Sequence, residues 1–93
     1  MIGDAELLRA LGLALEGGGW KTMLITSDGL LRLRVWDASV PVLGETVSVA
    51  CERDGAWFRS STGIPMARCD DLPGAVGYVE RVVGALVRPR TPA

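Results

Sequence analysis

Two Asp-Gly dipeptides constrain the fold of this chain more than any other feature of its sequence. The first, Asp28-Gly29, stands between two runs rich in apolar residues, 20–26 and 30–36. Because Asp-Gly favours the two-residue turn that matches the natural twist of paired strands, the two runs are expected to form an antiparallel hairpin. That turn also sets the register of the hairpin. The expected pairs are Lys21 with Trp36, Thr22 with Val35, Met23 with Arg34, Leu24 with Leu33, and Ile25 with Arg32.

The second dipeptide, Asp54-Gly55, predicts a second hairpin. The residues before it, 45–53, alternate between apolar and polar side chains, and residues 56–61 are expected to return as the fourth strand. With Asp54-Gly55 as the turn, Phe58 is expected to lie opposite Cys51. Cys51 is therefore interpreted as a small residue of the core.

Apolar residues at helical spacing predict one helix at each end of the chain. Asp4 is expected to cap a helix that runs to about Glu16, and Gly17-Gly18-Gly19 ends it because glycine tolerates the left-handed C-terminal position. Asp70-Asp71-Leu72-Pro73 is expected to open the last helix, since aspartate and proline both suit a helix N-terminus. The apolar stripes are Leu7, Leu8, Leu11 and Leu15 in the first helix, and Leu72, Val76, Val79, Val83 and Leu86 in the last.

These elements predict an α+β fold in the order α-β-β-β-β-(β)-α, an antiparallel sheet with the N- and C-terminal helices packed on one face. The optional fifth strand covers 64–68, where Pro65 restricts it to an edge or a bulge. Residues 37–44 are expected to form a loop. The 93 residues suffice for one domain. We expect that domain over 1–87 and a flexible tail over 88–93.

The chain contains no His, Asn or Gln, and this excludes several kinds of site. Without His, nucleophiles activated by His and most catalytic zinc centres are ruled out. No residue is therefore expected to be catalytic, to bind a cofactor or to ligate a metal, and the protein is not expected to be an enzyme. The remaining catalytic route would need Cys51 or Cys69 as a thiolate nucleophile.

The net charge of −1 argues against duplex nucleic acid as the main partner, because duplex-binding domains usually carry a basic excess. No apolar run approaches the ~20 residues of a membrane span, and the acidic start of the chain lacks the basic region of a signal peptide. We therefore expect a cytoplasmic protein with no membrane partner. Its two cysteines are interpreted as reduced, buried or half-buried thiols, with a disulfide left open as the alternative.

One sheet face remains after the two helices have been placed on the other. In the expected register it carries Lys21, Met23, Ile25, Arg32, Arg34 and Trp36. Because Met, Trp and Arg are enriched at protein interfaces, this face is the candidate interface with a second copy or with another protein. Two alternatives stay open. Solvent or the protein's own loops cover the face, or its Arg and Trp side chains bind single-stranded nucleic acid.

The segment Arg59-Ser60-Ser61-Thr62-Gly63 is rich in hydroxyl groups and ends in glycine. It is interpreted either as an anion-binding turn in which Arg59 contacts the anion, or as a strand end followed by an ordinary turn.

The stretch from Trp57 to Ala67, WFRSSTGIPMA, followed by Asp70-Asp71 and a Val-rich helix, resembles the C-terminal half of small uncharacterised actinobacterial α+β proteins. The order helix, four or five antiparallel strands, helix is also similar to minimal forms of the secretion-chaperone-like fold. Such proteins are typically dimers that bind other proteins, so this resemblance implies a chaperone-like, protein-binding role.

Together these features predict a non-catalytic protein-binding or accessory module that forms a homodimer through the Arg/Trp/Met sheet face. The small core, the glycines of the last helix and the open sheet edges all favour a homodimer. The alternative is a small regulatory domain that binds single-stranded nucleic acid or an anionic ligand through Arg32, Arg34 and Arg59.

Overall fold

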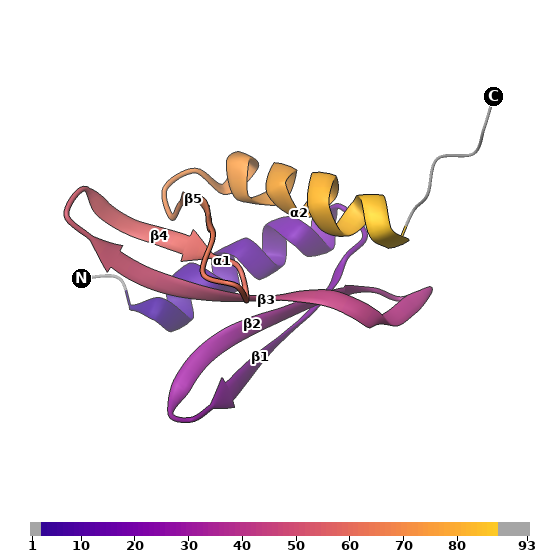
Figure 1. Ribbon diagram of the computed structural model, residues 1–93, viewed down its shortest axis with the longest axis horizontal. Helices are drawn as coiled ribbons and strands as arrows, with labels where there is room; N and C mark the ends of the chain where they lie inside the picture. Colours follow the sequence, from indigo (N-terminus) through magenta and orange to yellow (C-terminus); the bar gives the residue numbers. More distant parts are fainter. Residues whose placement is uncertain (1–2, 88–93) are drawn as a thin grey trace.

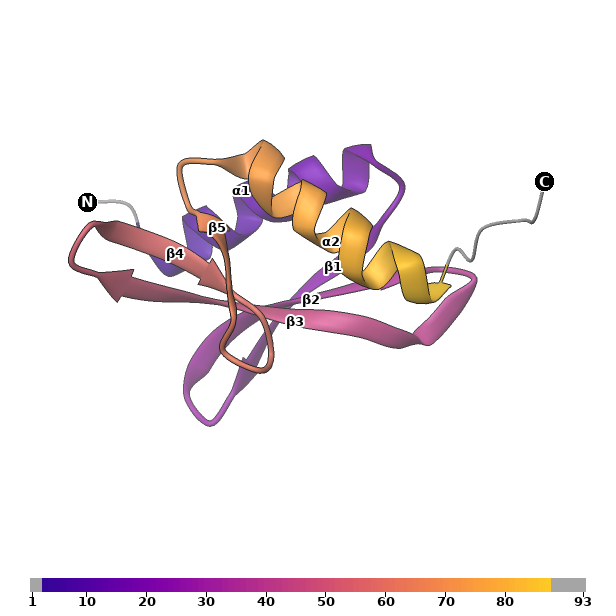
Figure 2. The same ribbon diagram turned by 45° about the horizontal axis from the view of Figure 1, so that its top comes forward.

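Seven helices and strands follow one another in the computed structural model, which describes residues 3–87 (Figure 1). They are α1 (Asp4–Gly17), β1 (Lys21–Ser27), β2 (Leu30–Asp37), β3 (Val40–Glu52), β4 (Gly55–Arg59), β5 (Pro65–Arg68) and α2 (Leu72–Val87). The strands form one antiparallel sheet in the order β1-β2-β3-β4-β5. Both helices lie on the same side of this sheet (Figure 1, Figure 2). The predicted α+β fold is confirmed, while the tail expected over 88–93 lies outside the described residues.

The hairpin β1–β2 has the turn and the register expected from its sequence. Asp28 has a φ of 54° and Gly29 a φ of 75°, both in the left-handed region that this turn requires. All five predicted cross-strand pairs are present. The alternation of side chains therefore divides the hairpin into a face covered by the helices and an opposite face, as predicted.

The expectation of a loop over residues 37–44 is wrong, because most of this segment belongs to β3. Asp37 closes a tight turn, since its Oδ1 accepts hydrogen bonds from the backbone N–H and the hydroxyl of Ser39, at 2.9 and 2.6 Å. The chain is extended again from Val40, and residues 41–43 bulge out of the ladder between β2 and β3. The proline in this bulge is tolerated because a bulged residue needs no ladder hydrogen bond.

The second hairpin is present, but its predicted register is wrong. Arg53-Asp54 occupies the turn instead of Asp54-Gly55, and Phe58 pairs with Val49 instead of Cys51. Each pairing partner moves by two residues, so every side chain keeps the face that was predicted for it.

A contact from β5 holds the turn of this second hairpin. Nη1 of Arg68 donates a hydrogen bond to Oδ2 of Asp54 at 3.0 Å, and Nη2 of Arg68 donates one to the Asp54 carbonyl oxygen. Gly55 has a φ of 125°, and a Cβ added to it would lie 2.9 Å from the Arg68 guanidinium. The position of the turn therefore depends on a residue that the Asp-Gly pattern does not include.

The helix ends are partly as predicted. Gly3 is the N-cap of α1 and makes no side-chain cap hydrogen bond, and Asp4 is the first helical residue. The expectation that Asp4 caps α1 is therefore wrong, although a carboxylate in the first turn still interacts favourably with the helix dipole. α2 begins as expected, because Oδ1 of Asp71 accepts the backbone N–H of Gly74 at 3.0 Å.

The core lies between the helices and the covered face of the sheet. The buried apolar side chains of the helices are Leu8, Leu11 and Leu15 in α1, and Ala75, Val79, Val83 and Val87 in α2. The stripe predicted for α1 is largely confirmed. In α2 the predicted core position of Leu86 is wrong, since this side chain is 64% exposed and Val87 is buried instead.

Trp20, expected as the first residue of a strand, instead joins the two helices. Its side chain is 2% exposed, and its Nε1 donates a hydrogen bond to Oε1 of Glu80 on α2, at 2.8 Å. Gly84 of α2 faces the indole, because a Cβ added there would lie 3.9 Å from Cζ2 of Trp20. A Cβ at this position would make an ordinary van der Waals contact, so the indole packs directly against this part of α2.

Candidate functional site

The face of the β1–β2 hairpin that points away from the helices carries six residues predicted from the sequence. We call this surface the open face; its members are Lys21, Met23, Ile25, Arg32, Arg34 and Trp36. Met23 is 57% exposed, Lys21 is exposed, and the other four are half-buried. The helices cover the opposite face, where Leu33 and Val35 are buried. The structure thus brings all six residues together on a surface that neither helix covers (Figure 1).

Arg34 is held at the centre of the open face by both neighbouring strands. It pairs with Met23 on β1 and with Thr46 on β3. A Cβ added to Gly44 would lie 3.3 Å from Cζ of Arg34 and 2.3 Å from the carbonyl oxygen of Val35. Glycine at this position therefore lets β3 approach β2 closely and lets the Arg34 side chain lie along the sheet.

Among residues 3–87, the cations of the open face have no carboxylate partners. Within residues 3–87, no salt bridge joins an acidic side chain to Lys21, Arg32 or Arg34. Arg32 donates a long hydrogen bond of 3.4 Å to the carbonyl oxygen of Ser27. Three positive charges therefore lie among apolar side chains without neutralisation by the described part of the chain.

A second basic cluster, on β4 and β5, is neutralised internally. Arg59 forms a salt bridge with Glu52 and donates a hydrogen bond to the carbonyl oxygen of Gly63 at 2.6 Å. Arg68 forms a salt bridge with Asp54 at 3.0 Å. Arg59, the candidate anion contact, thus already has an anionic partner in its own chain.

The hydroxyl-rich segment 59–63 forms a strand end and a turn, and a carboxylate of the chain already binds there. The backbone N–H of Ser61 donates to Oε1 of Glu45 at 2.9 Å. The same oxygen accepts the backbone N–H of Thr46 at 2.8 Å, and Glu45 is only 9% exposed. Sequence reasoning missed Glu45, although strand alternation places its side chain on the same face as the buried Val47.

An open groove of about 560 Å³ adjoins the open face where β1 begins. It is lined by Lys21, Met23 and Trp36 from the open face and by Gly19 from the turn after α1. The groove has room for an aliphatic side chain of a partner beside the Trp36 ring, and Lys21 and Glu16 contribute opposite charges to its lining.

The two cysteines have different environments. Cys69 is buried, and burial, reinforced by the negative charges of Asp4 and Asp70, raises the pKa of its thiol from 9.0 to about 11. Cys51 is exposed near the end of β3, so its expected place in the core is wrong.

No disulfide joins the two cysteines. Cys51 pairs with Ala56 on β4, and the backbone N–H of Cys69 bonds to the carbonyl oxygen of Ala56 from the other side. Two strand spacings separate the Cα atoms of the cysteines by about 9.5 Å. That separation exceeds the ~7 Å limit for a disulfide.

Residues 3–87 contain no group of three or more His, Cys, Asp or Glu side chains that could hold a metal ion. In the same range, no helix is long and apolar enough to cross a membrane. Comparisons of the chain with protein-family models, with curated proteins and with solved structures find no match. The open face is therefore interpreted from its own geometry and charge.

Proposed function

We propose that this protein is a non-catalytic binding module whose open face docks an acidic, partly apolar segment of another protein. The observation that carries the proposal is the set of three cations, Lys21, Arg32 and Arg34, that lack carboxylate partners within residues 3–87. Opposite charges on a partner would neutralise them and accelerate association. The apolar members of the open face supply the surface that becomes buried on binding.

A second copy that meets this surface face to face fits it less well than an acidic partner does. A twofold interface places the same patch against itself, so Arg32, Arg34 and Lys21 would meet cations of the second copy. Like charges brought together at an interface cost several kcal/mol. A homodimer would therefore be better accommodated by another surface of the chain.

Two observations support the non-catalytic part of the proposal. The raised pKa of Cys69 keeps its thiol protonated at neutral pH, which disfavours a thiolate nucleophile. The buried carboxylate of Glu45 is engaged by two backbone amides at 2.8 and 2.9 Å and contributes to holding a turn.

The test measures binding of a labelled synthetic peptide in which glutamates alternate with leucines and isoleucines, by fluorescence anisotropy. The wild-type protein is expected to bind it, and Arg34→Glu is expected to weaken binding by about tenfold or more, equivalent to 1.4 kcal/mol. Arg81→Glu is the matched control, because it makes the same charge change on the exposed surface of α2. Screening by salt should keep its effect within about twofold.

The alternative function, binding of single-stranded nucleic acid or another anion through Arg32, Arg34 and Arg59, is tested in the same assay with labelled oligo(dT). Tighter binding of the oligonucleotide, with affinity that falls steeply as salt is added, would favour this alternative. Equal binding by wild type, Arg34→Glu and Arg81→Glu would remove the open face from both functions. The absence of binding to the peptide would contradict the proposal.

A further inference from the structure

The edge of the sheet formed by β1 lacks the features that usually protect an exposed strand. β1 ends the strand order, and its outer edge has no strand partner within residues 3–87. Edge strands are typically blunted by proline, bulges, charges or short length. β5 at the opposite edge has Pro65, four residues and a register shift beside it. β1 has seven residues and no proline, and its charged residue, Lys21, stands at the first position of the strand.

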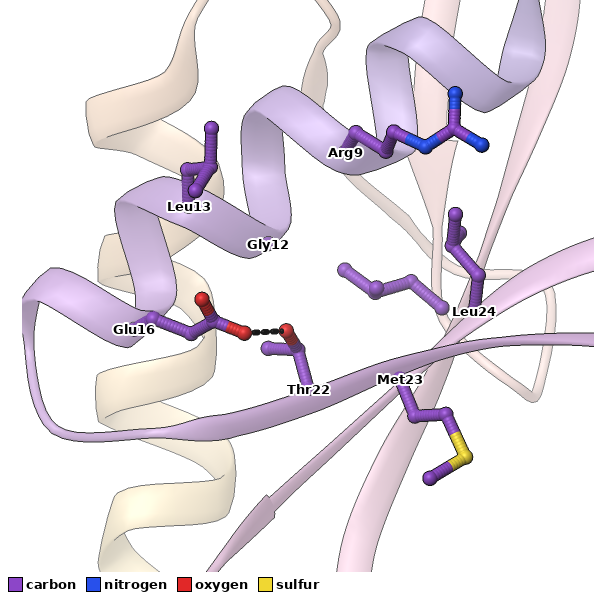
Figure 3. Close-up of a pocket in the computed structure, with 8 residues that line it drawn as sticks. Arg9, Gly12, Leu13, Glu16, Thr22, Met23 and Leu24 are labelled. Carbon is purple, nitrogen blue, oxygen red and sulfur yellow. Dashed lines mark hydrogen bonds between the residues drawn. The ribbon is translucent and has the colours of Figure 1, made fainter.

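The flank of α1 forms an apolar groove of about 320 Å³ above this open edge (Figure 3). Arg9, Leu13 and Glu16 contribute to it from α1, and Thr22 and Leu24 from β1. Figure 3 shows Arg9 above Leu24 and Glu16 above Thr22. Leu13 lies between Arg9 and Glu16 along the helix and is 72% exposed, so the flank presents a large apolar side chain between opposite charges.

We propose that the β1 edge and the α1 flank together join two copies of this chain in a symmetric dimer. A twofold axis perpendicular to the sheet, midway between the two β1 strands and level with Met23, pairs β1 antiparallel with β1 of the second copy, with Thr22 opposite Leu24. Because Glu16 lies above Thr22 and Arg9 above Leu24, the same rotation brings Arg9 to Glu16 of the second copy.

The spacing of the charged residues fits this single axis. Arg9 and Glu16 are separated by two helical turns, about 10.5 Å along α1. Leu13 lies close to their midpoint, so it meets Leu13 of the second copy. A self-complementary patch of this kind, in which each residue of a pair contacts the other across the axis, is what a twofold interface requires.

Both charged groups are available for the contact. Oε2 of Glu16 accepts a hydrogen bond from the Thr22 hydroxyl at 2.5 Å, which orients the carboxylate above β1 and leaves Oε1 for another donor. Within residues 3–87 no salt bridge involves Arg9. The second copy would supply the carboxylate that Arg9 lacks in its own chain.

This arrangement places both helix layers on one side of a continuous sheet and both open faces on the other. Met23 lies beside Met23 of the second copy, and Lys21 lies opposite Ile25. The cations of the two copies are thus side by side in one basic surface and avoid the like-charge contact of a face-to-face dimer. The dimer stands independently of the proposed function, but it would give a partner with two acidic segments the advantage of avidity.

The first experiment measures the molar mass of the full chain by sedimentation equilibrium from about 1 to about 200 µM, a range that detects micromolar dissociation constants. Wild type is expected to form a dimer, and Leu13→Glu is expected to be a monomer with an unchanged circular dichroism spectrum. Leu86→Glu is the matched control, because Leu86 is an exposed leucine of α2, 64% accessible, outside the groove. It is expected to remain dimeric.

The second experiment exchanges the charges. Arg9→Glu and Glu16→Arg should each raise the dimer dissociation constant by about tenfold, because each brings like charges together across the axis. The double variant Arg9→Glu/Glu16→Arg should restore the constant to within about threefold of wild type. A wild type that is monomeric throughout, a dimer insensitive to Leu13→Glu, or a double variant no better than the single ones would overturn the proposal.

Discussion

Replacement of Glu45 by alanine should destabilise this protein more than removal of an exposed acidic residue. Glu45 is 9% exposed, and its Oε1 accepts the backbone N–H groups of Thr46 and Ser61 at 2.8 and 2.9 Å. The second of these hydrogen bonds ties β3 to the turn that follows β4. Alanine would leave both amides without this acceptor.

The size of the effect follows from these two hydrogen bonds. A hydrogen bond to a charged group contributes about 1.5–3 kcal/mol, so the pair accounts for about 3–6 kcal/mol. We expect a loss of about 2–4 kcal/mol for Glu45→Ala, since water can reach part of the vacated site and bond to the amides. A domain of this size has about 5–10 kcal/mol of stability in total. The loss is therefore a large fraction of it.

The assay is urea unfolding monitored by tryptophan fluorescence at neutral pH, where a slope of about 1 kcal/mol per molar predicts a midpoint at least about 2 M lower. Glu45→Gln keeps an oxygen acceptor and should lose about 1 kcal/mol. Glu52→Ala removes a more exposed carboxylate that pairs with Arg59 and should cost less than about 1 kcal/mol. Equal losses for Glu45→Ala and Glu52→Ala, or unchanged hydrogen exchange at the Ser61 amide in Glu45→Ala, would refute the reasoning.

Three further predictions concern the cysteines and a glycine. The native protein should react with a thiol reagent at Cys51 and react at Cys69 only after denaturation; two reactive thiols in the native state would contradict the burial of Cys69. Because burial and nearby aspartates raise the pKa of Cys69 from 9.0 to about 11, the folded protein holds this proton more tightly than the unfolded chain does. This contribution to stability is fully present below pH 9 and is lost as the pH rises through 11, so the free energy of unfolding should fall more steeply over this window in wild type than in Cys69→Ala. If the free energy of unfolding falls equally steeply with pH in wild type and in Cys69→Ala, the raised pKa of Cys69 is not the cause. Gly44→Ala places a Cβ 2.3 Å from the carbonyl oxygen of Val35 and should cost about 1–3 kcal/mol in thermal unfolding. Gly17→Ala should cost nothing, because its Cβ would meet no atom within 4 Å beyond its chain neighbours and the backbone of its own helix.

The β1–β2 hairpin and its open face could be predicted from sequence because the information is local. The turn occupies two consecutive residues, Asp28-Gly29, and their positive φ angles determine the register of every pair in the ladder. The placement of Arg34 and Trp36 on one face follows from that register by alternation alone.

The second hairpin shows where local information ends. Asp54-Gly55 is as strong a turn signal as the first, yet the turn moves by one residue where Arg68 of β5 bonds to Asp54. The same shift places Cys51 near the exposed end of the hairpin. Glu45 is a similar case, since its two amide donors include one from a turn 16 residues away in the chain.

The sequence by itself determined the order of the two helices and the first four strands, the register of β1 with β2, and which six residues share the open face, because these depend on neighbouring residues and on the period of a strand or helix. Tertiary structure alone decided which charges are neutralised. Arg59 and Arg68 form salt bridges with carboxylates that the packing of β3, β4 and β5 brings close to them. Arg34 forms no salt bridge with a carboxylate in residues 3–87. Charge pairing depends on distances between segments remote in sequence, and composition with a net charge of −1 could not reveal an uncompensated basic face.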